Sequence, residues 1–409
     1  MKKTLALLLS IVLLLICPAC QTKEKTEEII SLYEPAAKKT LPAEEKTAAP
    51  EETKSPAALL AEKMTLEEKV GQLFIITPEE LYPSQAGKKL TEHIPAYALS
   101  VSEEMQETFA AYPAGGFILF GGNIESGEQL KELTASLHAL GENRPFVYID
   151  EEGGTVARIA NSDVIEAERF GNMQGVAETG DTANAFAVGA GIGEYLHEYG
   201  VDLDFAPVAD VNTNPDNPVI GKRAFGSEPE AAAQMVAAVI EGLHSEGVKS
   251  CIKHFPGHGD TTADTHKAYA ETLKSWEEIA GCEMLPFIAG INAGTDMVMV
   301  AHIAAPNVTS DDAPATLSYT LVTEKLRGEL GYNGVVVTDS MAMLAIADRY
   351  SPAEAAKEAF KAGVDIILIP DDYIAAFQGI LEAVQSGEIS ETRLNESVKR
   401  ILEMKMNNG

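Results

Sequence analysis

The sequence predicts one α/β domain built as a (β/α)8 barrel, and three observations support this prediction. Eight short, mostly apolar runs alternate with longer amphipathic segments, a pattern typical of a parallel sheet covered by helices. Polar or charged residues follow several of these runs. The 409-residue chain is long enough for one large barrel with additional rim segments. An open, doubly wound sheet is the alternative.

The N-terminal segment, residues 1–20, has the features of an export signal. Lys2 and Lys3 precede an apolar run over residues 5–16, which is too short for a comfortable membrane span. A small residue precedes Cys20, as in a lipoprotein cleavage site, so we expect Cys20 to carry a lipid. The protein would then be exported and anchored to the cell membrane. Ordinary secretion without lipidation is the alternative.

Residues 21–57 are rich in Lys, Glu, Thr, Ala and Pro and contain few large apolar side chains. Such a segment cannot bury enough apolar surface to offset the entropy lost on ordering, so we expect a tether. The folded domain is expected over residues 58–409 and carries most of the net charge of −31. This negative charge argues against nucleic acids and anionic surfaces as partners.

The predicted strands are residues 71–76, 115–120, 145–149, 201–208, 248–252, 297–300, 334–337 and 364–369. Amphipathic helices are expected over 128–140, 228–246 and 353–362, with a last helix within 386–406. The insert 77–113 between the first two strands is expected to form helices at the rim, and we assign it no role.

Charged side chains follow the apolar strands at the ends where a barrel builds its active site. Five strands lead, in order, to Asp150, Asp210, His254, His302 and Asp339. Because the active sites of such barrels lie at the carboxyl ends of the strands, these residues are candidates for a common site.

The stretch 253–266 is the densest polar cluster, with three histidines, two aspartates and a lysine. Three interpretations compete. The histidines could satisfy local hydrogen bonds, or His254, His258, Asp260, Asp264 and His266 could include metal ligands, although no His-Glu-x-x-His or Cys pair is present. Metal-free acid/base chemistry, with Asp264 orienting His266, is the interpretation we favour.

The run Lys-His-Phe-Pro-Gly-His-Gly, followed by Asp-x-His, resembles the signature of glycoside hydrolase family 3, in its β-N-acetylhexosaminidase branch. The resemblance implies that His266 is the acid/base and that Asp264 orients it. Thr338-Asp339-Ser340-Met341 is similar to the nucleophile motif of the family, which implies that Asp339 is the nucleophile. Alternatively, Asp339 caps the helix that follows.

Further residues match sugar-binding positions of that family. The resemblance implies substrate binding by Asp150, Arg158, Arg223, Lys253 and His254. Charged groups of this kind suit vicinal hydroxyls, and a guanidinium fork can hold two of them. Supporting roles around the site are expected for His258, Asp204, Asp210 and His302, with His302 at the pocket floor and His258 fixing its loop through backbone bonds. We assign no role to Glu151.

Cys251 and Cys282 could form one disulfide, but we expect Cys251 to be buried and reduced, and neither cysteine to be catalytic. The sequence therefore predicts a retaining exo-β-N-acetylhexosaminidase, without metal or cofactor, acting on cell-wall or chitin-type oligosaccharides. A phosphorylase or another family 3 β-glycosidase is the enzymatic alternative. A non-catalytic, sugar-binding surface lipoprotein is the alternative of another class.

Overall fold

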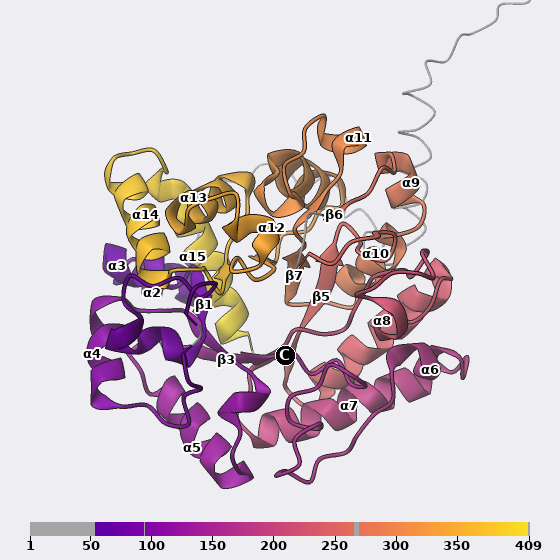
Figure 1. Cartoon of the computed structure of the whole chain (residues 1–409), viewed down its shortest axis with the longest axis horizontal. Helices are drawn as coiled ribbons and strands as arrows, with labels where there is room; N and C mark the ends of the chain where they lie inside the picture. Colours follow the sequence, from indigo (N-terminus) through magenta and orange to yellow (C-terminus); the bar gives the residue numbers. More distant parts are fainter. Residues whose placement is uncertain (1–53, 94, 266–269, 408–409) are drawn as a thin grey trace, which may run out of the picture.

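The computed structural model describes residues 54–93, 95–265 and 270–407 (Figure 1). Eight parallel strands form one sheet in the order β10-β1-β2-β3-β4-β5-β7-β9. The strands are β1 (Phe74–Ile76), β2 (Gly116–Leu119), β3 (Phe146–Ile149), β4 (Leu203–Asp204), β5 (Lys249–Phe255), β7 (Met297–Val300), β9 (Val335–Thr338) and β10 (Ile367–Leu368). A short parallel pair, β6 (Ala270–Glu271) and β8 (Ile303–Ala304), stands apart from this sheet.

The sheet curves into a barrel because its last strand returns to its first. Phe74 of β1 pairs with Ile367 of β10, and Val337 of β9 forms a parallel bridge with Ile366 just before β10. In Figure 1 the earliest and latest parts of the described chain accordingly lie side by side. The predicted (β/α)8 architecture is therefore confirmed, and the open doubly wound sheet is excluded.

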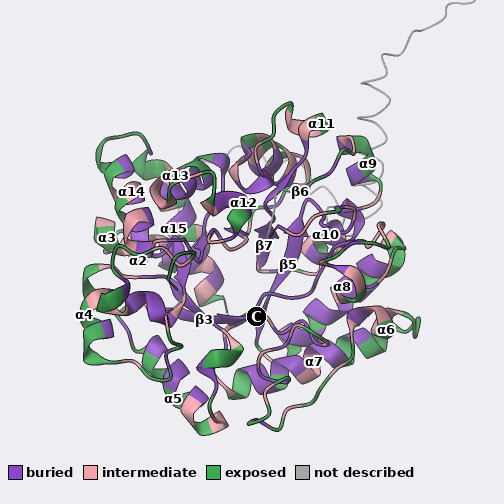
Figure 2. Ribbon diagram, viewed as in Figure 1, coloured by how far each residue is buried: buried purple, intermediate pink, exposed green. Residues whose placement is uncertain are grey.

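Helices surround the strands, with buried faces turned inward and exposed faces outward (Figure 2). The α-helices are α2 (Pro56–Ala61), α3 (Leu66–Gly71), α4 (Glu103–Ala111), α5 (Gly127–His138), α6 (Met173–Ala177), α7 (Thr182–Glu198), α8 (Pro229–Ser245), α9 (Trp276–Ala280), α10 (Met284–Asn292), α11 (Pro306–Thr309), α12 (Leu344–Ala347), α13 (Pro352–Ala362), α14 (Tyr373–Gln385) and α15 (Glu391–Met406). A π-helix, η6, spans Thr320–Glu329. The 3-10 helices are η1 (Pro78–Leu81), η2 (Pro83–Gln85), η3 (Gly121–Asn123), η4 (Gly221–Arg223) and η5 (Ala315–Leu317).

Local sequence signals set the ends of α13, which shows why the alternating pattern folds as expected. Ser351 and Glu354 form a capping box at its start, and Pro352 occupies the first turn, where no helical N–H partner is lost. Gly363 ends the helix at φ 117°, a backbone conformation that favours glycine. The chain can then enter the buried run that leads to β10.

The barrel interior is filled by strand side chains, as the continuous apolar runs predict. The strands β2, β3, β7 and β9 are buried at every position. Tyr148 of β3 stacks on Phe205 with ring centroids 5.5 Å apart. Each large apolar side chain removed from water in this way contributes roughly 1.5–3 kcal/mol. This packing holds the strand ends in fixed positions.

All eight predicted strands are present, but six differ in length, and β1, β4 and β5 show the reasons most clearly. β1 begins at Phe74 and not at residue 71, because the preceding helix α3 extends to Gly71. A capping box of Thr65 and Glu68 stabilises the start of that helix. β4 has only two residues, and Pro207, which lacks an N–H group, lies beyond it. β5 continues to Phe255, so the Lys253-His254 pair belongs to the strand and does not follow it.

The folded domain begins two residues earlier than predicted, because α2 starts at Pro56 and Ala57 is buried. The hydroxyl of Ser55 donates to Glu403 of α15 at 3.2 Å, which ties this start to the last helix. The insert 77–113 forms η1, η2 and α4. The expectations for the export signal and for Cys20 lie outside the described residues. Within the described residues, no helix is both long and apolar enough to cross a membrane.

Candidate active site

A cavity of about 340 Å³ opens where the carboxyl ends of the strands meet. Most of the predicted site residues line it, namely Asp150, Arg158, Arg223, Lys253, His254, His258 and Asp339. Apolar side chains complete the wall, among them Ile118, Phe120, Met299, Met343 and Ile369. One part of the wall therefore presents charges and another presents apolar surface.

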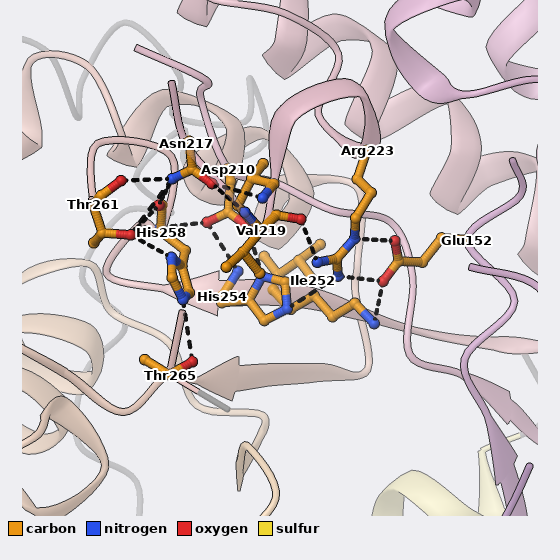
Figure 3. A network of polar contacts seen from close by, with 12 residues as sticks. Glu152, Asp210, Asn217, Val219, Arg223, Ile252, His254, His258, Thr261 and Thr265 are labelled. Carbon is orange, nitrogen blue, oxygen red and sulfur yellow. Dashed lines mark hydrogen bonds and ion pairs between the residues drawn. The ribbon is translucent and has the colours of Figure 1, made fainter. Parts of the chain in front are cut away.

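An alternating row of charges crosses the charged wall. The ammonium of Lys253 lies 2.7 Å from Oδ1 of Asp150 and 2.7 Å from Oε1 of Glu152. Arg223 donates to Glu152 through two nitrogens, at 2.8 and 2.7 Å (Figure 3). A nitrogen of Arg158 lies 3.3 Å from Oδ2 of Asp150. Each charge is held by a neighbour of opposite sign, which preorganises the row before any ligand binds.

The charges in this row keep their ionised forms although they are buried. Burial opposes ionisation of Glu152, but Lys253 and Arg223 outweigh it and lower the pKa of Glu152 far below its usual value. Burial likewise opposes the charge of Lys253, yet Asp150 and Glu152 raise the pKa of Lys253. Lys253 and Arg158 also outweigh burial at Asp150 and lower the pKa of Asp150. The site thus offers fixed charges to a polar ligand.

Glu152 is a site residue that sequence reasoning did not single out. It lies two positions after Asp150 in the same short motif, and its side chain is only 2% exposed. A buried carboxylate needs partners of opposite charge, but nothing in the sequence shows that Lys253 and Arg223 converge on it. That convergence requires β3, β5 and η4 to meet at one end of the barrel.

Glu151, for which the sequence suggested no role, shapes the backbone that carries Arg158. Its fully buried carboxylate accepts from the backbone N–H groups of Arg158, Ile159 and Ala160, at 2.5, 2.9 and 2.8 Å. The Tyr195 hydroxyl donates to the same carboxylate at 3.0 Å. Glu151 therefore fixes the segment from which Arg158 reaches the cavity.

Asp204 supports the same segment from the end of β4. Its Oδ1 accepts from the backbone N–H of Glu151 at 2.8 Å, and its side chain is fully buried. Burial raises the pKa of Asp204 well above the usual value, and the nearby charge of Glu151 acts in the same direction. The expected supporting role of Asp204 therefore corresponds to a direct contact with the Asp150-Glu151 turn.

Asp210 orients His254. Its Oδ2 lies 2.6 Å from Nδ1 of His254, and its Oδ1 accepts from the backbone N–H groups of His254 and His258 at 3.2 and 2.6 Å. The carboxylate makes Nδ1 the protonated nitrogen, so Nε2 faces the cavity as an acceptor, 3.5 Å from Arg223. Burial opposes ionisation of Asp210, but its contact with His254 lowers the pKa of Asp210.

His258 links the turn after β5 to the loop that leads to His266. Its ring nitrogens lie 2.7 Å from Oγ1 of Thr261 and 3.2 Å from Oγ1 of Thr265 (Figure 3). Asn217 donates to the carbonyls of His258 and Thr261, at 2.8 and 3.0 Å. The expectation of backbone bonds alone was thus incomplete, because the ring binds two threonine hydroxyls. Thr265 also lines the cavity.

Only one member of the proposed acid/base pair, Asp264, lies within the described residues. Asp264 is partly exposed on the loop between Thr261 and Thr265. His266 lies outside the described residues, so the pairing of Asp264 with His266 stays a prediction. The metal interpretation also included His266, together with His254, His258, Asp260 and Asp264. Within the described part of the chain, no group of three or more His, Cys, Asp or Glu residues is arranged to hold a metal ion.

Asp339 stands at the end of β9 and lines the cavity. Its backbone N–H donates to Val300 of the neighbouring strand at 2.8 Å, and its Oδ1 accepts from the N–H of Ser340 at 2.8 Å. It does not cap a helix, because α12 begins at Leu344 with Met343 as its N-cap. The carboxylate is therefore held on rigid backbone at the cavity wall.

His302 supports the backbone that follows Asp339 through a contact with Ser340. Its ring is fully buried, with Nε2 2.8 Å from the carbonyl of Ser340 and Nδ1 2.8 Å from Oγ1 of Thr316. Because a carbonyl only accepts, Nε2 carries the proton. His302 is not among the described residues that line the cavity, but it contacts the backbone of Ser340, which does line it.

The two cysteines of the domain are free thiols, and Cys251 is buried in β5, as expected. Burial raises the pKa of both thiols, to about 11 for Cys282. Neither cysteine lines the cavity within the described residues.

Comparison with known proteins adds independent information. The family model described as glycosyl hydrolase family 3 N terminal domain matches residues 65–404. Beta-hexosaminidase A of Pseudoalteromonas piscicida is 33% identical over 373 residues, covering 84% of this chain and 61% of that protein. A beta-hexosaminidase of Xanthomonas oryzae pv. oryzae is 34% identical over 281 residues, covering 68% of this chain and 82% of that protein.

A solved structure is similar along most of the chain. The glycoside hydrolase family 3 beta-N-acetylglucosaminidase from Paenibacillus sp. str. FPU-7 superposes with a TM-score of 0.74 at 36% identity, covering 84% of this chain and 62% of that one. This chain thus spans about three fifths of the length of the Pseudoalteromonas and Paenibacillus proteins.

Proposed function

This chain belongs to glycosyl hydrolase family 3, and from this premise we propose that it is a retaining exo-β-N-acetylhexosaminidase. It would remove terminal β-linked N-acetylglucosamine from cell-wall fragments or chitin-type oligosaccharides. One observation carries the proposal: Asp339, on the rigid end of β9, faces the same cavity as Lys253 and Arg158. The names of the relatives support the substrate class.

The proposed reaction has two displacements at the anomeric carbon. A carboxylate oxygen of Asp339 forms a bond to this carbon while the glycosidic C–O bond breaks and His266 gives its proton to the departing oxygen. Water then attacks the same carbon and gives a proton to His266 while the bond between this carbon and Asp339 breaks, which frees the carboxylate and releases the sugar with its configuration retained. In this scheme Asp264 orients His266, and an imidazole suits both steps because its ordinary pKa is closer to neutral pH than that of a carboxyl group.

The charged wall would hold the terminal sugar. Asp150 can accept hydrogen bonds from sugar hydroxyls, while Arg158 and Lys253 can donate them. Because these groups are already paired, binding costs little reorganisation. His254 presents Nε2 to the cavity as an additional acceptor. A cavity of about 340 Å³ suits one sugar ring, which supports attack at a chain end.

The test compares hydrolysis of 4-nitrophenyl N-acetyl-β-D-glucosaminide and the corresponding glucoside by the full chain. We expect turnover of the N-acetylated substrate, resistance to EDTA and loss of turnover in Asp339→Ala. Azide should restore cleavage in this variant and yield a glycosyl azide of inverted configuration, because azide replaces the missing carboxylate as nucleophile. Asp348→Ala, a change on the helix after the nucleophile loop, is the control.

Other outcomes point to the alternatives. Release of sugar 1-phosphate in phosphate buffer would identify a phosphorylase. Sugar binding without turnover would identify a binding protein. Loss of activity in EDTA would restore the metal interpretation of the cluster around His254 and His266.

We also propose that the mature protein is anchored outside the cytoplasm through a lipid on Cys20. Lys2, Lys3 and the apolar run 5–16 support export, and Cys20 supplies the thiol. Labelling cells with a radioactive fatty acid should mark the protein, and Cys20→Ala should abolish the label and release the protein from the membrane fraction. Labelling of the Cys20→Ala variant would contradict the assignment.

A further inference from the structure

Tyr97 lies on the insert between β1 and β2, a segment for which the sequence suggested no role. Its exposed fraction is 50%. Its ring lies directly on the backbone of Gly122. A Cβ atom at Gly122 would stand only 2.1 Å from Cδ2 and 2.3 Å from Cε2 of Tyr97. Any residue other than glycine at position 122 would displace the ring. The contact therefore leaves Tyr97 seated on Gly122 with half of its surface in solvent.

Three side chains form hydrogen bonds with the backbone next to Tyr97. The N–H of Ala98 donates to Glu79 at 2.7 Å, and its carbonyl accepts from Asn123 at 3.0 Å. Gln129 donates to the carbonyl of Leu99 at 2.8 Å. Ala98, Glu79 and Asn123 are buried, and Asn123 also donates to Glu79 at 2.5 Å. Tyr97 is therefore held by rigid backbone, so little conformational entropy would be lost when a ligand covers it.

Tyr97, held by these hydrogen bonds of its neighbours, lies close to a residue of the cavity wall. Gly122 belongs to η3, which follows β2 at its carboxyl end, and it lies two residues after Phe120. Phe120 lines the cavity, and the guanidinium of Arg158 lies over its ring at 5.4 Å. Two residues span at most about 7.6 Å between Cα atoms. The Cα atom of Gly122, on which the Tyr97 ring rests, is thus no more than about 7.6 Å from the Cα atom of Phe120 in the cavity wall.

We propose that Tyr97 is a stacking platform for the sugar on the leaving-group side of the scissile bond. This inference rests on the proposed function. The terminal sugar occupies the cavity among the charged residues, so the next sugar must lie outside it. The C–H face of a pyranose is apolar and packs on an aromatic ring, whose hydroxyl can also bind a sugar hydroxyl. Tyr97 would therefore favour oligosaccharides over glycosides with a small leaving group.

The experiment compares two substrates of the full chain, methyl N-acetyl-β-D-glucosaminide and N,N′,N″-triacetylchitotriose. For Tyr97→Ala we expect KM for the trisaccharide to rise roughly five- to tenfold, with kcat/KM for the methyl glycoside unchanged. Tyr97→Phe should keep most of the preference. Gly122→Ala should reproduce the loss, because it displaces the ring. Phe186→Ala removes a ring of 39% exposure from the outer helix α7 and is the matched control.

A binding measurement separates failure of this inference from failure of the proposed function. Calorimetric titration of the trisaccharide into Asp339→Asn requires no turnover, and adding Tyr97→Ala should weaken binding by the same factor. The wild type could cleave neither substrate while Tyr97→Ala still weakens trisaccharide binding in the titration. In that case the proposed hydrolysis is wrong, and the role of Tyr97 as a stacking platform is retained. Equal affinity with and without the Tyr97 ring, equal losses on both substrates, or absence of trisaccharide binding would overturn the platform.

Discussion

Lys253 and Glu152 form an ion pair at 2.7 Å, and their side chains are only 3% and 2% exposed. Neither charge has access to bulk water, so each depends on its partners in the row that includes Asp150 and Arg223. A buried pair of this kind contributes little net stability, but removal of one member leaves an uncompensated charge. The row therefore couples the shape of the cavity to the stability of the domain.

Glu152→Gln should impair both stability and substrate binding. The substitution keeps the size of the side chain but leaves Lys253 and Arg223 without their shared counter-charge. We expect the free energy of unfolding in urea to fall by about 3 kcal/mol. KM should rise for every substrate, because the displaced cations no longer present their donors correctly.

The matched control for this prediction is Glu388→Gln. Glu388 also contacts a lysine, Lys361, but on the exposed surface, where such pairs contribute little. This variant should unfold at the same urea concentration as the wild type. An equally small effect of Glu152→Gln would show that the row is not a structural unit.

Asp204→Asn and Asp210→Asn should have opposite pH dependences. Burial raises the pKa of Asp204 in the folded protein, so the wild type loses stability as pH rises from about 4 through the raised value. Asparagine has no such charge to accommodate and can still accept from Glu151. Asp204→Asn should therefore gain stability relative to the wild type as pH increases.

For Asp210 the folded-state pKa is lowered, so the carboxylate stabilises the protein above its unfolded pKa, and this stability is lost on acidification. Asp210→Asn should cost about 2 kcal/mol at pH 7, and the difference should shrink as pH falls below about 4. Urea unfolding of both variants between pH 3 and 8 tests the signs. Parallel pH curves for the two variants would refute the assignment.

Thr265→Val should slow catalysis while the protein stays folded at the assay temperature. It deletes the hydroxyl that lies 3.2 Å from the ring of His258, immediately before His266. If this contact positions the loop, kcat should fall roughly tenfold, while the loss of one buried hydrogen bond lowers the free energy of unfolding by only about 1–3 kcal/mol. Thr262→Val, at an exposed position of the same loop, is the control. Equal kcat values for the two variants would contradict a positioning role.

Lys405 on α15 provides a pH test far from the cavity. Its ammonium donates to Gln72 at 2.9 Å and to the carbonyl of Gly115 at 2.6 Å, and burial lowers its pKa to about 7. Between pH 7 and 10 the unfolded chain therefore binds more protons than the folded one. The wild type should gain stability over Lys405→Met across this range, by at most roughly 1.4 kcal/mol per pH unit.

Lys399→Met is the control for this prediction, because Lys399 is 51% exposed on the same helix. Its stability relative to the wild type should not change with pH over this range. A constant difference between wild type and Lys405→Met would show that Lys405 does not titrate differently in the folded and unfolded states.

Several features could be predicted from the sequence because they depend on neighbours along the chain. Apolar runs bounded by turn residues predicted all eight strands, and helix caps such as Ser351 and Gly363 follow from local backbone chemistry. The polar residues at the strand ends predicted much of the charged part of the cavity wall, including Asp150, Lys253 and Asp339. Strand position alone therefore brings these side chains to one end of a parallel barrel.

Other features were decided only by tertiary structure, because they depend on which distant segments become neighbours. Glu152 joins the site through Lys253 and Arg223, which come from separate elements of the barrel. His302 is fully buried and contacts the carbonyl of Ser340 and the hydroxyl of Thr316, which come from distant segments. Tyr97 meets Gly122 because the insert folds back onto η3. Local patterning specifies the elements and their ends, whereas contacts between side chains require the closed barrel.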